Sequence, residues 1–150
     1  MTTETKRAKE AMGQVRVTLE LANFNDEENA RLGVVMESQV RRASVEALVD
    51  TGATQLVLPK TVADQLGLRV LGRVPVRYAN EQKAVRDLVG VVTVTLMGRK
   101  TRVDAIVEPD KTYALLGQIP LEALDFHVDP KGQRLIPNPD SPDAPLSEMQ

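Results

Sequence analysis

The sequence has 150 residues, of which 42% are hydrophobic and 27% are charged, and these values are typical of one globular domain. Aromatic residues make up only 3%, so the core has to be built from aliphatic side chains. The formal net charge of -2 lacks the basic excess of nucleic-acid-binding domains, and the absence of cysteine excludes a disulfide framework and a thiolate metal site.

The sequence predicts that the protein does not associate with a membrane. Residues 1–13 are polar and charged without the apolar run of a secretory signal, and we expect them to form a flexible arm. No stretch reaches the roughly 18 apolar residues that a membrane span requires. With the lack of cysteine, these features predict a cytoplasmic protein that binds neither nucleic acid nor a membrane.

Short strands are predicted in the first part of the chain. Apolar and polar residues alternate over residues 15–21, which predicts a half-buried strand. The polar run at 23–29 is interpreted as a turn. Further strands are predicted at 31–37 and 44–49, and a short apolar run follows at 55–58.

A short helix is predicted after Pro59, because the N–H that proline lacks has no partner in a first helical turn. Val62, Ala63 and Leu66 lie on one face at helical spacing. Gly67 is suited to end this helix.

Two hairpins are predicted in the middle of the chain. Residues 74–78 and 84–89 flank a polar tip at 80–83, which predicts the first hairpin. The Val- and Thr-rich segment 90–107 predicts a second hairpin that turns at 97–100.

The last part of the chain has an apolar segment at 113–117, a short helical stretch at 120–124 and a strand at 133–136. Prolines exclude a regular strand beyond this point, and they stand at positions 137, 139, 142 and 145. We therefore predict one domain over 14–137 and a flexible tail over 138–150. Short strands with one or two short helices indicate a mostly β fold, a small closed barrel.

The residues that suggest chemistry are Asp50, Thr51, Gly52 and Ala53. The apolar residues 47–49 run directly into Asp50, and a carboxylate at the end of a buried strand is costly unless it is hydrogen-bonded or paired. Gly52 permits a tight turn that brings backbone N–H groups close to the carboxylate, and Thr51 offers a hydroxyl to a neighbouring chain. The segment predicts one carboxylate in a fixed, partly desolvated position.

One such carboxylate needs a second one for catalysis. Two carboxylates about 3 Å apart cannot both ionise, so they share a proton; one then activates a water while the other polarises a carbonyl. The sequence holds a single motif of this kind, so the pair requires two-fold symmetry, in which Asp50 meets its own copy in a homodimer.

The segment Asp50-Thr51-Gly52-Ala53 resembles the active-site signature of the retropepsin family of aspartic proteases. The resemblance covers roughly residues 15–137, with a strand after the signature at 55–58, a flap hairpin at about 76–90 and a Leu-Leu-Gly segment before a short helix. The chain is especially similar to bacterial single-domain members, in which Leu-Val-Asp-Thr-Gly-Ala is followed by Leu-Pro, a short helix and Leu-Gly-Leu.

This resemblance implies a closed antiparallel β barrel of the acid-protease type, with one lobe per chain. It implies an aspartic endopeptidase that works as a homodimer on a peptide or protein substrate, without a metal or a cofactor. The site residues that it implies are Asp50 as the catalyst, Thr51, Gly52 and Ala53 as its support, Tyr78, Ala79 and Asn80 over the substrate, and Leu115, Leu116 and Gly117 as a crossed strand beside the catalytic loop.

Two alternatives stay open at this point. The same dimeric fold is compatible with a non-catalytic peptide-binding or assembly module, and Asp50 is also compatible with an ordinary turn at a strand end. The sequence departs from retroviral relatives at the flap tip, which contains no glycine. His127 is the only histidine, and nothing near it suggests a catalytic triad.

Overall fold

The computed structural model describes residues 14–129, 131–132 and 134–140, and the predicted arm at 1–13 and most of the predicted tail lie outside these residues. The strands of the main sheet are β1 (Arg16–Asn23), β2 (Arg42–Val49), β3 (Leu56–Pro59), β4 (Arg69–Arg77), β5 (Lys83–Leu96), β6 (Arg99–Glu108) and β7 (Ala114–Leu116).

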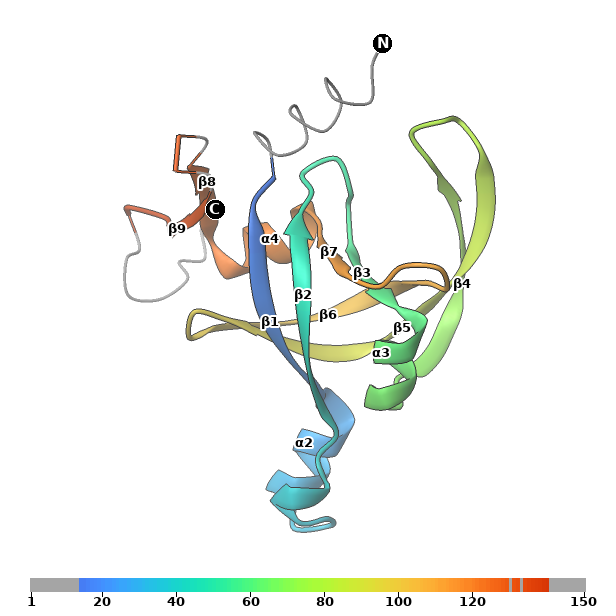
Figure 1. Cartoon of the computed structure of the whole chain (residues 1–150). Helices are drawn as coiled ribbons and strands as arrows, with labels where there is room; N and C mark the ends of the chain where they lie inside the picture. The colour runs from blue at the N-terminus through green and yellow to red at the C-terminus, as the bar shows by residue number, and fades with distance from the viewer. Residues whose placement is uncertain (1–13, 130, 133, 141–150) are drawn as a thin grey trace, which may run out of the picture.

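These strands form the closed β barrel that the sequence predicted (Figure 1). Their order is β1-β2-β7-β3-β6-β5-β4, and an additional pairing of β1 with β5 closes the sheet into a ring, with β4 outside it. Most neighbouring strands are antiparallel, but β7 runs parallel to β2, and β3 runs parallel to β6. The described residues form three short α-helices rather than one or two: α2 (Phe24–Arg31), α3 (Lys60–Leu66) and α4 (Gln118–Leu124).

The barrel interior is aliphatic, as the low aromatic content required. The largest side chains without solvent contact are mainly leucines and valines, namely Leu19, Leu21, Leu56, Leu58, Leu66, Leu116, Leu124, Val92 and Val94. The helix after Pro59 is confirmed, and Gly67 ends it with a φ of 61°, a left-handed conformation that glycine adopts without strain. Within the described ranges, no helix has the length and apolar character needed to cross a membrane.

The predicted turn at 23–29 is wrong, because these residues begin helix α2. Asn23 caps the helix by accepting a hydrogen bond from the Asp26 N–H, at 3.0 Å. Acidic residues in the first turn and Arg31 in the last turn complement the helix dipole. The helix buries no residue completely, so it lacks the apolar face on which a periodicity argument depends.

The predicted strand at 31–37 is also wrong. The chain instead turns back at Gly33, whose φ is 78°, and the Val34 N–H donates to the Asn29 carbonyl at 2.8 Å. A short 3₁₀ helix, η1 (Glu37–Gln39), follows. The apolar side chains that suggested a strand are exposed, with Val34 at 68% and Met36 at 65%.

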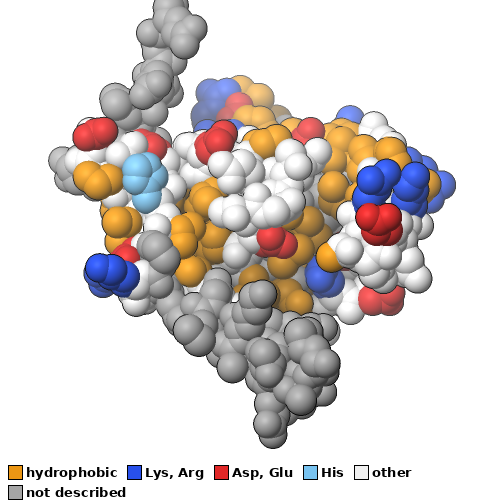
Figure 2. Space-filling view, turned by 90° about the horizontal axis from the view of Figure 1, so that it is seen from above, with side chains coloured by type: hydrophobic (Ala, Val, Ile, Leu, Met, Phe, Trp, Pro, Cys, Tyr) orange, Lys and Arg blue, Asp and Glu red, His pale blue; other side chains and the backbone are white. Residues whose placement is uncertain are grey.

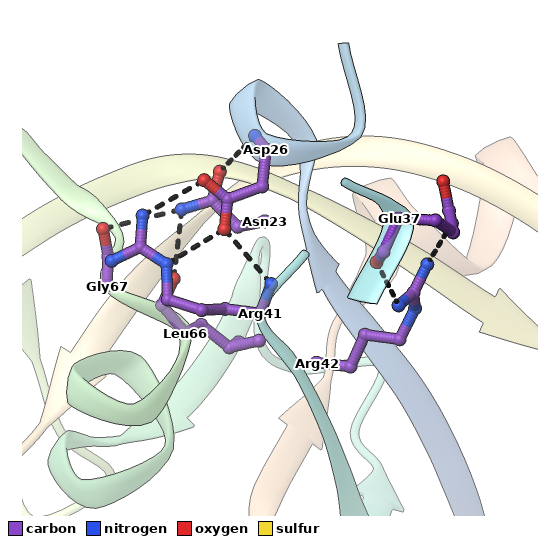
Figure 3. Close-up of polar contacts among 7 residues, drawn as sticks. All are labelled: Asn23, Asp26, Glu37, Arg41, Arg42, Leu66 and Gly67. Carbon is purple, nitrogen blue, oxygen red and sulfur yellow. Dashed lines mark hydrogen bonds and ion pairs between the residues drawn. The ribbon is translucent and has the colours of Figure 1, made fainter. Parts of the chain in front are cut away.

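Asn23 and Asp26 attach α2 to the end of α3 and to the chain that enters β2 (Figure 3). The buried Asn23 amide donates to the Leu66 carbonyl at 2.9 Å. Two nitrogens of Arg41 donate to the two carboxylate oxygens of Asp26, at 2.8 and 3.0 Å, and these bonds lower the pKa of Asp26. Arg41 lies directly over Gly67, where a Cβ atom would come within 1.8 Å of the guanidinium.

Both central hairpins are present, with longer strands than predicted. β5 has 14 residues and belongs to both hairpins, because it pairs with β4 along its first part and with β1 and β6 along its second. The predicted turn at 97–100 is shorter, since Arg99 already starts β6 and is only 5% exposed. Its guanidinium donates to the carbonyls of Leu124 and Asp125 at the C-terminal end of α4.

The chain after α4 forms a second, two-stranded sheet of β8 (Phe126–Asp129) and β9 (Arg134–Pro137). The sequence predicted the second of these strands but not the first. The described beginning of the tail contacts this region, because the Asn138 side-chain amide donates to the Asp125 carboxylate at 2.9 Å.

We predict that Asn23→Ala lowers the free energy of unfolding by about 2–3 kcal/mol, because it removes a helix cap and leaves the Leu66 carbonyl without its buried donor. Equilibrium urea denaturation measures the change. Asn29→Ala is the matched control, since Asn29 is exposed in the same helix and should change stability by less than about 0.5 kcal/mol. Equal stability losses in the two variants would contradict the role given to Asn23.

Candidate active site

Asp50 directly follows β2 and is held there by β7. The two strands run parallel, with Leu48 opposite Leu115 and Val49 opposite Leu116. The ladder continues by one hydrogen bond, from the Asp50 N–H to the Leu116 carbonyl at 3.0 Å. The backbone of Asp50 is therefore fixed by the barrel itself, at the edge where the barrel strands give way to the loop.

The loop after Asp50 folds back onto its carboxylate. The Gly52 N–H donates to Asp50 Oδ1 at 3.0 Å, and the Ala53 N–H donates to the Asp50 carbonyl at 3.1 Å. A Cβ atom on Gly52 would lie 3.2 Å from Oδ1, so the small residue permits this approach. Asp50 is half-buried, whereas Thr51 and Gly52 are exposed.

The start of α4 holds the same loop from its other side. The Gln118 N–H donates to the Ala53 carbonyl and the Ile119 N–H donates to the Thr54 carbonyl, both at 2.8 Å. Gly117 lies so close that an added Cβ atom would be 2.2 Å from the Gln55 carbonyl oxygen and 2.8 Å from that of Ala53. The structure thus places the Leu-Leu-Gly segment beside the loop, with Leu115 and Leu116 in β7 and Gly117 in van der Waals contact.

A groove of about 840 Å³ opens in front of Asp50. The loop after β2 and the tip of the β4–β5 hairpin lie on the same side of the barrel in Figure 1. We call residues 73–87, the outer part of this hairpin, the flap. The groove is lined by Asp50, Gly52, Ala53, Thr54 and Gln55 of the loop, by flap residues 74–79, and by Val57, Ile106, Glu108, Lys111 and Leu115.

Figure 2 looks down on this side of the molecule. Hydrophobic side chains surround a paler central region, and Lys and Arg side chains gather at the end where the flap lies. The exposed basic residues of the flap are Arg73, Arg77 and Lys83. The groove therefore has a largely apolar lining, and the basic residues on the flap lie with the acidic residues Glu81 and Asp87.

The predicted flap residues differ in their relation to the groove. Tyr78 and Ala79 line it together with Asp50, whereas Asn80 does not. The Asn80 side chain instead accepts a hydrogen bond from the Gln82 N–H at 3.0 Å. The tip has a left-handed residue in place of the missing glycine, and this residue is Glu81, with a φ of 68°.

Sequence reasoning did not identify Glu108, a buried acid that lines the groove from the end of β6. Its carboxylate accepts a hydrogen bond from the Tyr78 hydroxyl at 2.8 Å and a close ion-paired hydrogen bond from Arg86. Burial and the bond to Glu108 raise the pKa of the Tyr78 hydroxyl. The sequence does contain a signal for Glu108, because this acidic residue directly follows the apolar run 105–107. Asp50 follows the apolar run 47–49 in the same way.

Metal ligands are not grouped in this region. Among the described residues, no three or more His, Cys, Asp or Glu side chains lie together in a way that would hold a metal ion. His127 lies on β8 with an exposed side chain.

A closed barrel whose single Asp-Thr-Gly loop faces a groove below a hairpin defines a retropepsin-like aspartic protease fold. The family follows from the sequence, which matches over residues 36–123 the family described as "gag-polyprotein putative aspartyl protease". The chain belongs to this family.

Two solved structures match the chain at low identity. The protease of Simian Foamy Virus (mac) has 16% identity and a TM-score of 0.45, with 71% of this chain and 90% of that chain covered. The foamy viral protease-reverse transcriptase, solved in complex with an RNA/DNA hybrid, has 10% identity and a TM-score of 0.47. That match covers 73% of this chain but 12% of the longer protein. A comparison with curated proteins finds no match.

We predict that Gly117→Ala destabilises the protein by about 1–3 kcal/mol, because the new methyl group has to push away the carbonyls of Ala53 and Gln55. Urea denaturation measures the loss, and hydrogen exchange should show faster exchange in the loop at 50–55. Gly72→Ala is the control, since no atom lies within 4 Å of its added Cβ position. A Gly117→Ala protein as stable as the control would disprove the tight contact.

Proposed function

We propose that the protein is an aspartic endopeptidase, in which Asp50 and the Asp50 of a second copy activate a water for hydrolysis of a peptide bond. The observation that carries this proposal is the position of Asp50. It is half-buried, held by the Gly52 N–H, and faces a groove of about 840 Å³ that flap residues 74–79 also line.

The need for a second copy follows from the acids of the groove. The described lining contains two carboxylates, Asp50 and Glu108. Glu108 is engaged by Tyr78 and Arg86, so it is not free to share a proton with Asp50. A second Asp50 is then the natural partner, and two-fold symmetry supplies it.

The surface around the loop supports such a dimer. Thr51 is exposed beside Asp50, where its hydroxyl is able to bond to a second chain. Ile119, which follows the loop contact at the start of α4, is 48% exposed although it is a large apolar residue. A second copy that covers this side would bury both side chains.

In the proposed reaction, the two carboxyl groups hold one proton between them. The ionised carboxylate takes a proton from the water as the water oxygen attacks the carbonyl carbon, and the protonated carboxyl donates its proton to the carbonyl oxygen. One carboxyl group then gives its proton to the amide nitrogen while the other carboxylate takes a proton from a hydroxyl of the tetrahedral intermediate. The C–N bond breaks, a carboxylic acid and an amine are released, and one proton remains on the pair.

The lining of the groove indicates the kind of substrate. The apolar residues of this lining include Val57, Val74, Val76, Ile106 and Leu115. Burial of apolar side chains is favourable by about 25 cal/mol per Å² of apolar surface, so peptides with aliphatic residues next to the cleaved bond should bind best.

We predict that Asp50→Asn abolishes cleavage of a mixed peptide library, while the fold and the dimer are retained. The amide keeps the size of the side chain and an oxygen that accepts from Gly52, but it cannot take part in the shared-proton pair. Asp64→Asn, in the exposed Lys60–Asp64 ion pair of α3, is the control and should cleave like the parent. Cleavage by Asp50→Asn at the parent rate would refute the mechanism, and binding of peptides without cleavage by the parent would indicate a binding module.

Mixing parent and Asp50→Asn chains tests whether two chains form one site. If chains exchange and pair at random, equal amounts give about one half mixed dimers, so activity per parent chain should fall to about half. Native mass spectrometry confirms the exchange, and addition of Asp64→Asn chains serves as the control. Constant activity per parent chain after proven exchange would show that each chain works alone.

A further inference from the structure

One carboxylate links both strands of the flap to the wall of the groove. Glu108, the last residue of β6, accepts a hydrogen bond from the hydroxyl of Tyr78, the residue after β4, at 2.8 Å. It also accepts from Nε of Arg86, which lies on β5 and donates to the Tyr78 hydroxyl as well, at 3.0 Å. We call Tyr78, Arg86 and Glu108 the flap clasp.

The flap clasp is a partly buried contact. The side chain of Glu108 is 12% exposed and that of Arg86 is 26% exposed. The Arg86 guanidinium also lies 5.9 Å from the centre of the Tyr78 ring. Hydrogen bonds between charged groups are stronger than neutral ones, and a buried carboxylate is costly unless it has such partners, so the three side chains depend on one another.

The other ion pair of the flap lacks these properties. Arg73 and Asp87 lie 3.6 Å apart with side chains that are 69% and 47% exposed. An exposed pair of this kind contributes little to stability. The Arg73–Asp87 pair also joins the two flap strands to each other, so of these two ion pairs the clasp alone joins the flap to the wall of the groove.

The clasp also lies between the groove and a second, smaller cavity. Tyr78 and Glu108 line the groove that contains Asp50, and both also line a smaller cavity of about 350 Å³ together with Arg86. A substrate in the main groove would contact the clasp from one side, so the position of the clasp decides the shape of the site.

We propose that Glu108 is a positioning residue that holds the flap over the groove before substrate arrives. Glu108 itself touches no reacting atom; it acts through Tyr78 and Arg86. A flap that is already in place does not have to be ordered when a peptide binds, which lowers the cost of binding. This inference rests on the proposed function for its effect on catalysis, but the clasp itself is measurable without any activity.

The test compares the parent with Glu108→Gln and Tyr78→Phe, which remove the charge and the hydroxyl of the clasp, and with Asp87→Asn as the control. Hydrogen exchange measured by mass spectrometry reports the opening of the flap, and urea denaturation identifies any variant that is globally unstable. We expect exchange of the flap amides to be about tenfold faster in both clasp variants and unchanged in the control.

Tyrosine absorbance gives a second measurement that needs no activity. The protein has two tyrosines and no tryptophan, so a Tyr113→Phe background leaves Tyr78 as the only tyrosine. In this background Glu108→Gln should lower the pKa of Tyr78, because the bond to Glu108 raises it and the bond to Arg86 lowers it. With an active parent, Glu108→Gln should increase KM about three- to tenfold and change kcat less than about twofold.

Each outcome decides one question. Unchanged flap exchange and an unchanged Tyr78 titration in Glu108→Gln would overturn the clasp, whatever the activity. Changes in both measurements, without a change in the control, support it. A parent that cleaves no peptide while its flap responds to Glu108→Gln would overturn the proposed protease function and support the clasp. A fall in kcat at constant KM would overturn the positioning role.

Discussion

The contact of Gly117 with the carbonyls of Ala53 and Gln55 is the constraint on which the site depends. Gly117 lies directly after β7, which pairs in parallel with β2 on one side and antiparallel with β3 on the other. The same contact brings the first N–H groups of α4 to the loop. The position of the loop that carries Asp50 therefore depends on one close approach between two backbone segments, while the pairing of β1 with β5 closes the barrel.

The sequence predicted those parts of the structure that short-range chemistry determines. The loop at 50–53 follows from a carboxylate and a glycine at the end of an apolar strand, and the helix that ends at Gly67 follows from its proline start and glycine end. The strands of the barrel follow from alternation along the chain. Each of these features depends on neighbours in the chain, so one sequence contains enough information to find it.

The features that the sequence did not predict depend on distant partners. Helix α2 has no apolar face, and it is held through Asn23 and Asp26 by groups from α3 and from Arg41. Arg99 looked like part of an exposed turn, but it is buried because its charge meets the carbonyls at the end of α4. Glu108 was overlooked because its partners, Tyr78 and Arg86, lie on the flap. Hydrophobic periodicity indicates which positions face the core, but it contains no information on contacts between polar side chains that are far apart in the sequence.

Strand β5 belongs both to the flap and to the barrel, and this has a consequence for protein engineering. Its first residues belong to the flap and its last residues close the barrel, and one strand runs through both parts with a register shift between Val89 and Val92. Residues 79–82 at the tip are therefore an exchangeable cassette, because a loop grafted there leaves the strand register intact. One residue inserted within β5 would instead reverse the alternation beyond it and turn Val92 and Val94 from the core toward solvent. The flap is thus modular at its tip and inseparable from the barrel at its base.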